Sequence, residues 1–116
     1  MAFRFEDLQV WQKAMDLGEQ INQLTKKFPK DEIYILTSQI KRAADSVVLN
    51  IAEGSTGQSK SVYKIFLSYS LRSAIEVVSC LFITKRRNFI NEENFKALYN
   101  EYEILVKMIT ALKNSF

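Results

Sequence analysis

Histidine is absent from the 116 residues, and cysteine occurs only once, at position 80. The chain therefore lacks the commonest general base and the commonest metal ligand, and its serines have no histidine to activate them. We expect no enzyme, no catalytic residues, no metal site and no cofactor. Because a single cysteine cannot form an internal disulfide, the composition fits a reducing compartment.

Glycine and proline are also scarce, occurring only at Gly18, Pro29, Gly54 and Gly57. Pro29 disfavours a helical Phe28, and the stretch from 54 to 58 is the most loop-like part of the chain. With a third break near 88–91, where Asn91 can cap a helix, four segments remain. With 47% apolar and 25% charged residues, the chain is typical of one globular domain covering residues 1–116.

Apolar residues recur at spacings of three and four in each segment, and sustained period-two alternation is absent. The pattern predicts helices over about 6–28, 31–53, 59–87 and 91–115. Four helices joined by short connections predict an all-α, up-down-up-down four-helix bundle. Gly18 lies inside the first helix, where we expect it to allow close approach by a neighbouring helix.

Long uncharged runs are missing as well. The longest nearly uncharged run, Ser73 to Thr84, contains Glu76 and is too short to span a bilayer. The N-terminal residues include early acids and no continuous apolar stretch, so we expect no signal peptide. We expect a cytoplasmic protein with no membrane contact.

The third segment carries more apolar residues than one buried helix face requires. An exposed apolar face of this kind is typical of an interface, so we expect a homo-oligomer. The alternative is that these residues are scattered surface apolars, which are common. The interface candidates are Val62, Ile65, Tyr69, Ile75, Val78 and Phe82.

Positive charge exceeds negative charge by only three, with 16 Lys and Arg against 13 Asp and Glu. Six cations close the first and third helices, and an up-down bundle brings those ends together: Lys26, Lys27, Lys30, Lys85, Arg86 and Arg87. They could bind a polyanion such as RNA or DNA. Alternatively, they only offset the helix dipoles, since four acids start the second and fourth helices at the same end.

A second group of nucleic-acid-binding candidates consists of Lys41, Arg42, Lys60 and Lys64. Lys60 and Lys64 are an i,i+4 pair of like charges near the Gly54–Gly57 turn, which is slightly unfavourable without a counter-charge. The alternative is that all four are simply solvated.

Several stretches resemble one bacterial family. They are FEDLQVWQKA (5–14), Phe28-Pro29-Lys30, LTSQIK (36–41) and RAADSVVLNIAEG (42–54). Together they resemble the four-helix-bundle family of 23S rRNA-intervening-sequence proteins. The resemblance implies a four-helix bundle that assembles into a ring, as a pentamer. It also implies kinship to accessory proteins of diversity-generating retroelements, which are bundles that bind nucleic acid and a reverse transcriptase.

We expect structural roles for five residues of the stretch 42–54: Arg42, Ser46, Asn50, Glu53 and Gly54. Small residues such as Ser46 allow helices to approach, and Asn50 with Glu53 could tie the following turn. Arg42 and Glu53 are too far apart to pair and need partners elsewhere, within the subunit or across a subunit boundary.

Two positions depart from the family pattern. Val62 stands where an acid is common, and Arg72 stands where a glycine would favour close packing.

These features favour a ring-forming scaffold that contacts RNA or DNA through basic surfaces. The alternative is a protein–protein adaptor that docks a partner, such as a reverse transcriptase-like protein, on the apolar third helix.

Overall fold

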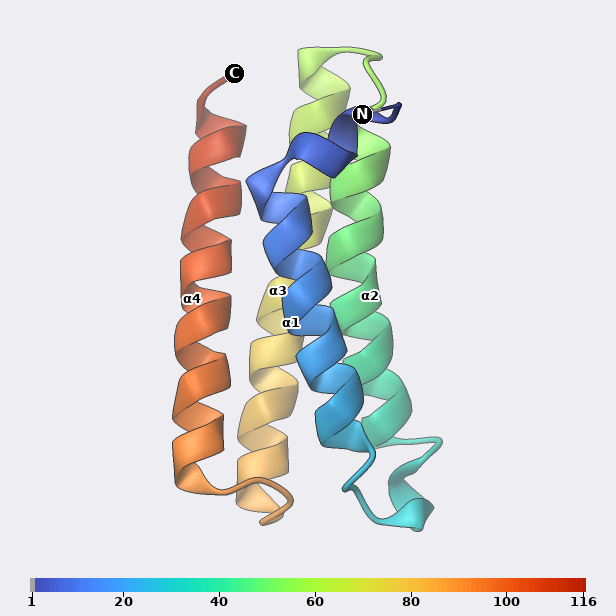
Figure 1. Ribbon diagram of the computed structural model, residues 1–116, viewed down its shortest axis with the longest axis vertical. Helices are drawn as coiled ribbons and strands as arrows, with labels where there is room; N and C mark the ends of the chain where they lie inside the picture. The colour runs from blue at the N-terminus through green and yellow to red at the C-terminus, as the bar shows by residue number, and fades with distance from the viewer. Residues whose placement is uncertain (1) are drawn as a thin grey trace.

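The computed structural model describes residues 2–116, in which four α-helices and two short 3-10 helices occur and no strand. Consecutive α-helices run in opposite directions (Figure 1). The all-α prediction is therefore confirmed. The elements are η1 (Arg4–Asp7), α1 (Gln9–Thr25), η2 (Lys30–Glu32), α2 (Leu36–Gly54), α3 (Lys60–Arg86) and α4 (Glu92–Asn114).

The first two helices are shorter than the sequence predicts. α1 begins at Gln9 instead of residue 6, because Leu8 has an extended backbone (φ −81°, ψ 124°) after the η1 turn. α2 begins at Leu36 instead of residue 31, because η2 follows Pro29 and Ile35 leaves helical geometry (φ −119°, ψ −100°). The bounds of α3 and α4 lie within one residue of the predicted ones.

The core is formed by most residues of the predicted apolar rows of all four helices, whereas Ile33 and Phe116, which belong to those rows, are exposed. Burying each large side chain contributes about 1.5–3 kcal/mol. The contact between α2 and α3 is the most extensive, and that between α1 and α4 is the least extensive. The largest fully buried side chains are Leu17, Ile21, Ile40, Val47, Ile51, Leu67, Val77, Leu81, Thr84, Tyr102, Leu105 and Ile109.

Two serines of α3 connect it to α2. Ser70 Oγ donates to the carbonyl oxygen of Val47 at 3.1 Å, and Ser73 Oγ donates to Ser46 Oγ at 2.9 Å. Both side chains face α2, so these bonds join the two helices. These two hydrogen bonds set the register of α3 relative to α2.

Gly54 packs closely against α3. A Cβ atom at this position would lie 2.9 Å from Phe66 Cβ and 3.1 Å from Tyr63 Cδ1. Gly18, in contrast, has no atom within 4 Å of such a Cβ. The predicted close approach at Gly18 is therefore wrong within the subunit, and α2 and α3 meet at Gly54 instead. Gly57 (φ 89°) makes the turn that follows.

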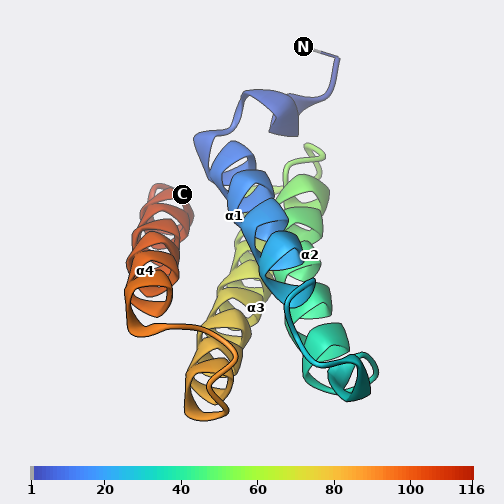
Figure 2. The same cartoon turned by 60° about the horizontal axis from the view of Figure 1, so that its bottom comes forward.

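The α1–α2 and α3–α4 connections lie at one end of the bundle (Figures 1 and 2). At the opposite end lie η1, the α2–α3 turn and the C-terminus of α4 (Figure 1). There the Phe116 ring lies 4.8 Å from that of Tyr63, measured between centroids. The bundle is about 43 Å long and 23 Å wide.

Within residues 2–116, α3 is the one helix with the length and apolar composition of a membrane span. About 33% of that apolar stretch is buried in the bundle. Core helices of soluble proteins have the same length and composition, so these properties do not identify a span.

Candidate nucleic-acid interface at one end of the bundle

The C-terminus of α3 is closed by a turn that depends on Asn88. Asn88 has φ 63°, its N–H donates to the Lys85 carbonyl at 3.0 Å, and the Phe89 N–H donates to the Thr84 carbonyl at 3.0 Å. These two bonds form a Schellman motif, in which asparagine is the usual residue after glycine. The motif turns Phe89 back towards the bundle.

The two connections are held together by a ring contact. Phe28, which is buried, and Phe89 have ring centroids 5.6 Å apart. The sequence did not predict this contact. The sequence signal for it is an asparagine, Asn88, that follows the basic last turn of α3 and is itself followed by an apolar residue. The contact places residues 26–35 beside residues 85–91, and we call this surface the basic end.

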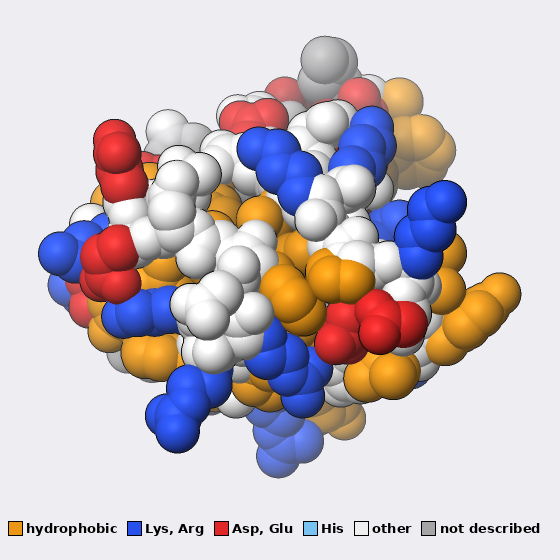
Figure 3. All heavy atoms as spheres, turned by 90° about the horizontal axis from the view of Figure 1, so that it is seen from below, with side chains coloured by type: hydrophobic (Ala, Val, Ile, Leu, Met, Phe, Trp, Pro, Cys, Tyr) orange, Lys and Arg blue, Asp and Glu red, His pale blue; other side chains and the backbone are white. Residues whose placement is uncertain are grey.

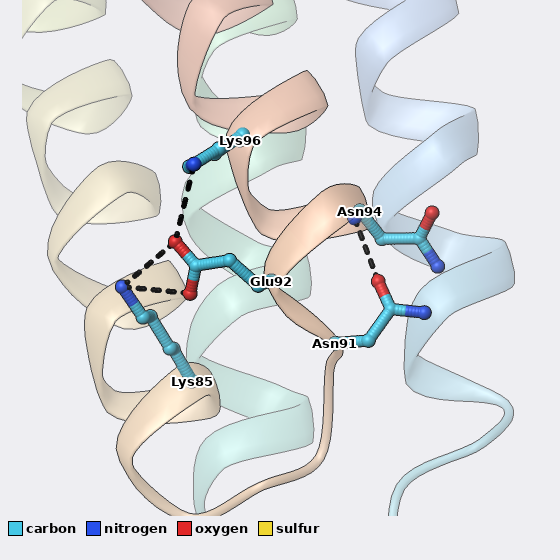
Figure 4. A network of polar contacts seen from close by, with 5 residues as sticks. All are labelled: Lys85, Asn91, Glu92, Asn94 and Lys96. Atoms are coloured by element: carbon cyan, nitrogen blue, oxygen red, sulfur yellow. Dashed lines mark hydrogen bonds and ion pairs between the residues drawn. The ribbon is translucent and has the colours of Figure 1, made fainter.

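Lys85 is neutralised at the start of α4. Its Nζ lies 3.0 Å from Glu92 Oε2, and Lys96 Nζ lies 4.0 Å from Glu92 Oε1 (Figure 4). Lys85 Nζ also lies 4.6 Å from the centre of the Phe95 ring. The predicted cap of α4 is confirmed, because Asn91 Oδ1 accepts from the Asn94 N–H at 2.7 Å (Figure 4).

Arg87 joins the two connections. Its Nη1 lies 3.5 Å from Glu32 Oε1, and the Glu32 side chain is only 15% exposed. Glu32 Oε1 also accepts from the Leu36 N–H at 3.4 Å, at the start of α2. Arg87 and Glu32 thus form an ion pair that ties η2 to the end of α3.

The other four cations at this end are exposed: Lys26, Lys27, Lys30 and Arg86. None of them has a carboxylate within 4.0 Å among residues 2–116. Asp31 and Glu93 are the exposed acids at this end for which no ion pair is found either in the described part of the chain. The structure places all six predicted cations at this end, and two of them are ion-paired. Figure 3 shows this end with separate basic side chains spread among apolar, acidic and other groups.

A hollow of about 780 Å³ adjoins the basic end on the outer side of α3. A smaller hollow of about 330 Å³, between α3 and the start of α2, shares Ser79, Ile83 and Arg87 with it. The basic end therefore continues into the apolar outer face of α3. The larger hollow is lined by Ser79, Phe82, Ile83, Lys85, Arg86, Arg87 and Asn88.

The second predicted group of cations is not one surface. Gly54 lies against Tyr63, so Lys60 and Lys64 stand at the far end of the bundle. Lys41 and Arg42 lie towards the other end of α2, near the level where Gln39 Nε2 donates to Glu76 Oε2. Since α2 and α3 run antiparallel, about eleven residues, or roughly 16 Å along the axis, separate the two pairs.

The predicted interface residues divide into two sets. Four are exposed on the outer face of α3: Ile65, Tyr69, Ile75 and Phe82. Val62 and Val78 are half-buried, and Val78 packs against the core. Phe82 also contacts α4, with its ring centroid 5.0 Å from that of Phe95. Ile83 is a further exposed residue that the prediction omitted.

The motif residues mostly find partners within α2. Arg42 Nη2 donates to Ser38 Oγ at 2.9 Å, so Arg42 has a partner one turn earlier. Asn50 Nδ2 donates to the carbonyl and Oγ of Ser46 at 2.9 and 3.0 Å. The prediction that Asn50 ties the following turn is therefore wrong, because Ser46 lies closer on the same helix face. Glu53 is exposed.

Arg72 points away from the packed faces of α3 and is exposed. The bulky cation therefore does not stand where the helices pack, contrary to the expectation from the family pattern.

Cys80 is a buried thiol. Burial raises its pKa, and the nearby Glu76 carboxylate raises it further. Tyr63 and Tyr102 are buried, and Trp11 is half-buried with its ring centroid 4.8 Å from that of Phe5. Among residues 2–116, no group of three or more His, Cys, Asp or Glu side chains could hold a metal ion.

Comparison with known proteins identifies one family. The model of the family described as 23S rRNA-intervening sequence protein matches residues 6–111. A solved structure from Bacteroides thetaiotaomicron, described as a protein with unknown function from the S23 ribosomal protein family, has the same fold. It is 23% identical, the match covers 90% of this chain and 95% of that chain, and the TM-score is 0.84. No match was found among curated proteins.

Proposed function

This chain belongs to the family of 23S rRNA-intervening sequence proteins, and we propose that it is a non-enzymatic, oligomeric scaffold that binds RNA or DNA through the basic end. One observation carries this proposal. Lys26, Lys27, Lys30 and Arg86 are exposed and lack a carboxylate within 4.0 Å among the residues described. Cations left without such a partner are available to phosphate groups.

Oligomerisation would strengthen the binding. Six cations and four acids leave an excess of two positive charges at the basic end of each subunit. In a ring of five copies, as the family resemblance implies, about ten such charges would surround one rim. A single strand could then contact several subunits at once, which raises its affinity without any new kind of contact.

The exposed apolar residues on α3 support the homo-oligomer. Ile75 is 60% exposed at the middle of this face, and Ile65, Tyr69 and Phe82 are exposed along it. A charged residue at the centre of an apolar interface is costly because it is desolvated without a partner. We therefore expect Ile75→Asp to give smaller particles in light scattering while circular dichroism remains helical. An unchanged mass would exclude this face as the interface.

Binding to nucleic acid is tested by its dependence on salt. If four cations of one subunit contact phosphates, the logarithm of the affinity should fall with the logarithm of the salt concentration with a slope of about −2.8. Affinity for a single strand should then drop about 50-fold between 50 and 200 mM salt. No binding at about 50 mM salt would exclude the proposal.

Two variants of equal net charge distinguish binding at the basic end from an effect of the overall charge. One replaces the four unpaired cations by glutamine: Lys26, Lys27, Lys30 and Arg86. The matched control replaces four cations elsewhere that belong to neither candidate group: Arg4, Arg72, Lys107 and Lys113. Each variant loses four of the positive charges and has a net charge of −1 instead of +3. The first should lose most of the salt dependence, and the second should keep it. Equal losses would mean that binding depends on overall charge alone.

A second candidate function is a protein–protein adaptor. The hollow beside Phe82 and Ile83 favours it, because this apolar surface is exposed and concave. Partner binding there would have a salt slope near zero and would be lost in Phe82→Asp. Loss of binding in the four-cation variant instead would favour nucleic acid.

A further inference from the structure

Tyr34 is the most exposed of the large hydrophobic side chains in the described part of the chain. Its side chain is 90% exposed, and its neighbours Ile33 and Ile35 are 54% and 62% exposed. No core residue covers the ring, so both of its faces are open to solvent. An aromatic ring this open is unusual, since large rings bury much of their surface in folded proteins.

The backbone beneath Tyr34 is held in place. The Glu32 N–H donates to the Pro29 carbonyl at 3.0 Å, and the Ile35 N–H donates to the Glu32 carbonyl at 3.0 Å. The Glu32 side chain is fixed by Arg87 and by the Leu36 N–H. The ring is therefore presented from an ordered turn, and little backbone entropy would be lost when a ligand stacks on it.

Three of the four cations that lack an ion pair lie on the same connection as Tyr34. These are Lys26, Lys27 and Lys30, and Lys30 precedes Tyr34 by four residues. Cations that follow a phosphate backbone, together with an exposed aromatic ring that stacks on bases, are the usual means of binding single-stranded nucleic acid. In a duplex the bases are stacked on each other, and a ring at the surface cannot reach their faces.

We propose that Tyr34 stacks on an unpaired base, so that the basic end binds single-stranded in preference to duplex nucleic acid. The proposal rests on the proposed function, because it assigns the class of nucleic acid to the same end of the bundle. The face of a base is the same in RNA and DNA, so stacking alone predicts that both single strands bind.

The test uses fluorescein-labelled strands of 20 nucleotides and mixed sequence, as single-stranded RNA, single-stranded DNA and duplex, in fluorescence anisotropy. Tyr34→Ala should weaken single-strand binding about 5-fold to 150-fold, which is the usual effect of removing one stacking ring. Tyr34→Phe keeps the ring and should bind as the natural protein does. Phe3→Ala removes an exposed aromatic ring at the opposite end of the bundle and is the matched control.

Two further readouts identify stacking. Tyr34→Ala removes no charge, so its salt slope should equal that of the natural protein. Its affinity for the duplex should not change. A Tyr34→Ala variant that binds single strands normally, or that loses as much duplex binding, overturns the proposal while leaving the proposed function intact.

Particle mass is measured on the same samples. A smaller mass in Tyr34→Ala would place Tyr34 between copies of the chain and overturn its role in stacking. If the natural protein binds no strand at about 50 mM salt, the proposed function and the role of Tyr34 both fall. The two failures are therefore distinguishable.

Discussion

Adding one methyl group at Gly18 and at Gly54 should change the stability of the bundle in opposite directions. Both glycines are helical, Gly18 inside α1 and Gly54 at the last residue of α2. A new Cβ at Gly18 meets no atom within 4 Å, whereas one at Gly54 lies 2.9 Å from Phe66 Cβ. The two alanine variants therefore differ in their surroundings and not in the chemistry of the change.

The gain at Gly18 comes from the backbone. Alanine is favoured over glycine in a helix interior by about 1 kcal/mol, because the unfolded chain loses less freedom on folding. With nothing to displace, Gly18→Ala should raise the free energy of unfolding by about 0.5–1 kcal/mol. For a chain of this length that corresponds to about 2–6 °C in Tm.

The loss at Gly54 comes from packing. Phe66 Cβ is attached directly to the backbone of α3, so no rotation of the side chain can move it away. The clash between the new Cβ and Phe66 Cβ can be relieved only if α2 and α3 move apart. Overpacking of this kind costs about 1–3 kcal/mol. After the helix-propensity gain is subtracted, Gly54→Ala should lower the free energy of unfolding by up to about 2 kcal/mol.

Urea unfolding followed by circular dichroism at 222 nm measures both variants at one protein concentration. Equal stability of the two variants would show that α2 and α3 are further apart at Gly54 than the structure has them. If Gly18→Ala is instead destabilised and its urea midpoint depends on protein concentration, a second copy of the chain packs on α1 at this point.

Three further effects follow from buried groups of the core. Ser70→Ala should cost about 1 kcal/mol in urea unfolding, because the Val47 carbonyl loses a buried hydrogen bond, and unchanged stability would refute a role for this bond. Burial raises the pKa of Tyr102, and the Asp45 carboxylate raises it further, so the folded state keeps a proton that the unfolded state releases. The free energy of unfolding should therefore fall as the pH rises above about 10, and that of Tyr102→Phe should fall less steeply. Equal pH dependence of the two proteins would show that Tyr102 titrates normally. Cys80 should react with Ellman's reagent only in denaturant, and rapid reaction of the folded protein would contradict its burial.

The helices and the core could be predicted because local signals agree with one another. Apolar spacing in α3 and α4 identifies Leu67, Val77 and Leu105 as buried, and Asn91 gives the start of α4. These predictions need only the period of the helix and the chemistry of its caps. The start of α2 was misplaced because Asp31 and Glu32 fit a first helical turn equally well.

The partners of polar side chains could not be predicted, since they depend on which helix lies opposite. Ser70 has the same local sequence signals whether it bonds within α3 or across to Val47. Glu32 and Arg87 are distant in sequence, and only the packing of two loops brings them together. The same limit applies to Gly18 and Gly54, because a free Cβ position and a crowded one differ only in their neighbours.

Exposure of Tyr34 is the least predictable feature of the basic end. The sequence places Ile33, Tyr34 and Ile35 inside a helix that begins at residue 31, with Ile33 on its apolar row. Because α2 begins at Leu36, this run remains in the connection and outside the packed face. Because the helix starts five residues later than predicted, Ile33 is exposed and Tyr34 lies in the connection.

An even number of antiparallel helices returns η1 and the end of α4 to the end of the bundle opposite the basic end. A fluorescent protein, an affinity tag or a surface tether joined at either terminus would project from that end. Immobilised in this way, every molecule would offer its two loops to the solution in the same orientation. The geometry suits single-molecule and biosensor measurements, in which random attachment would hide part of the sample.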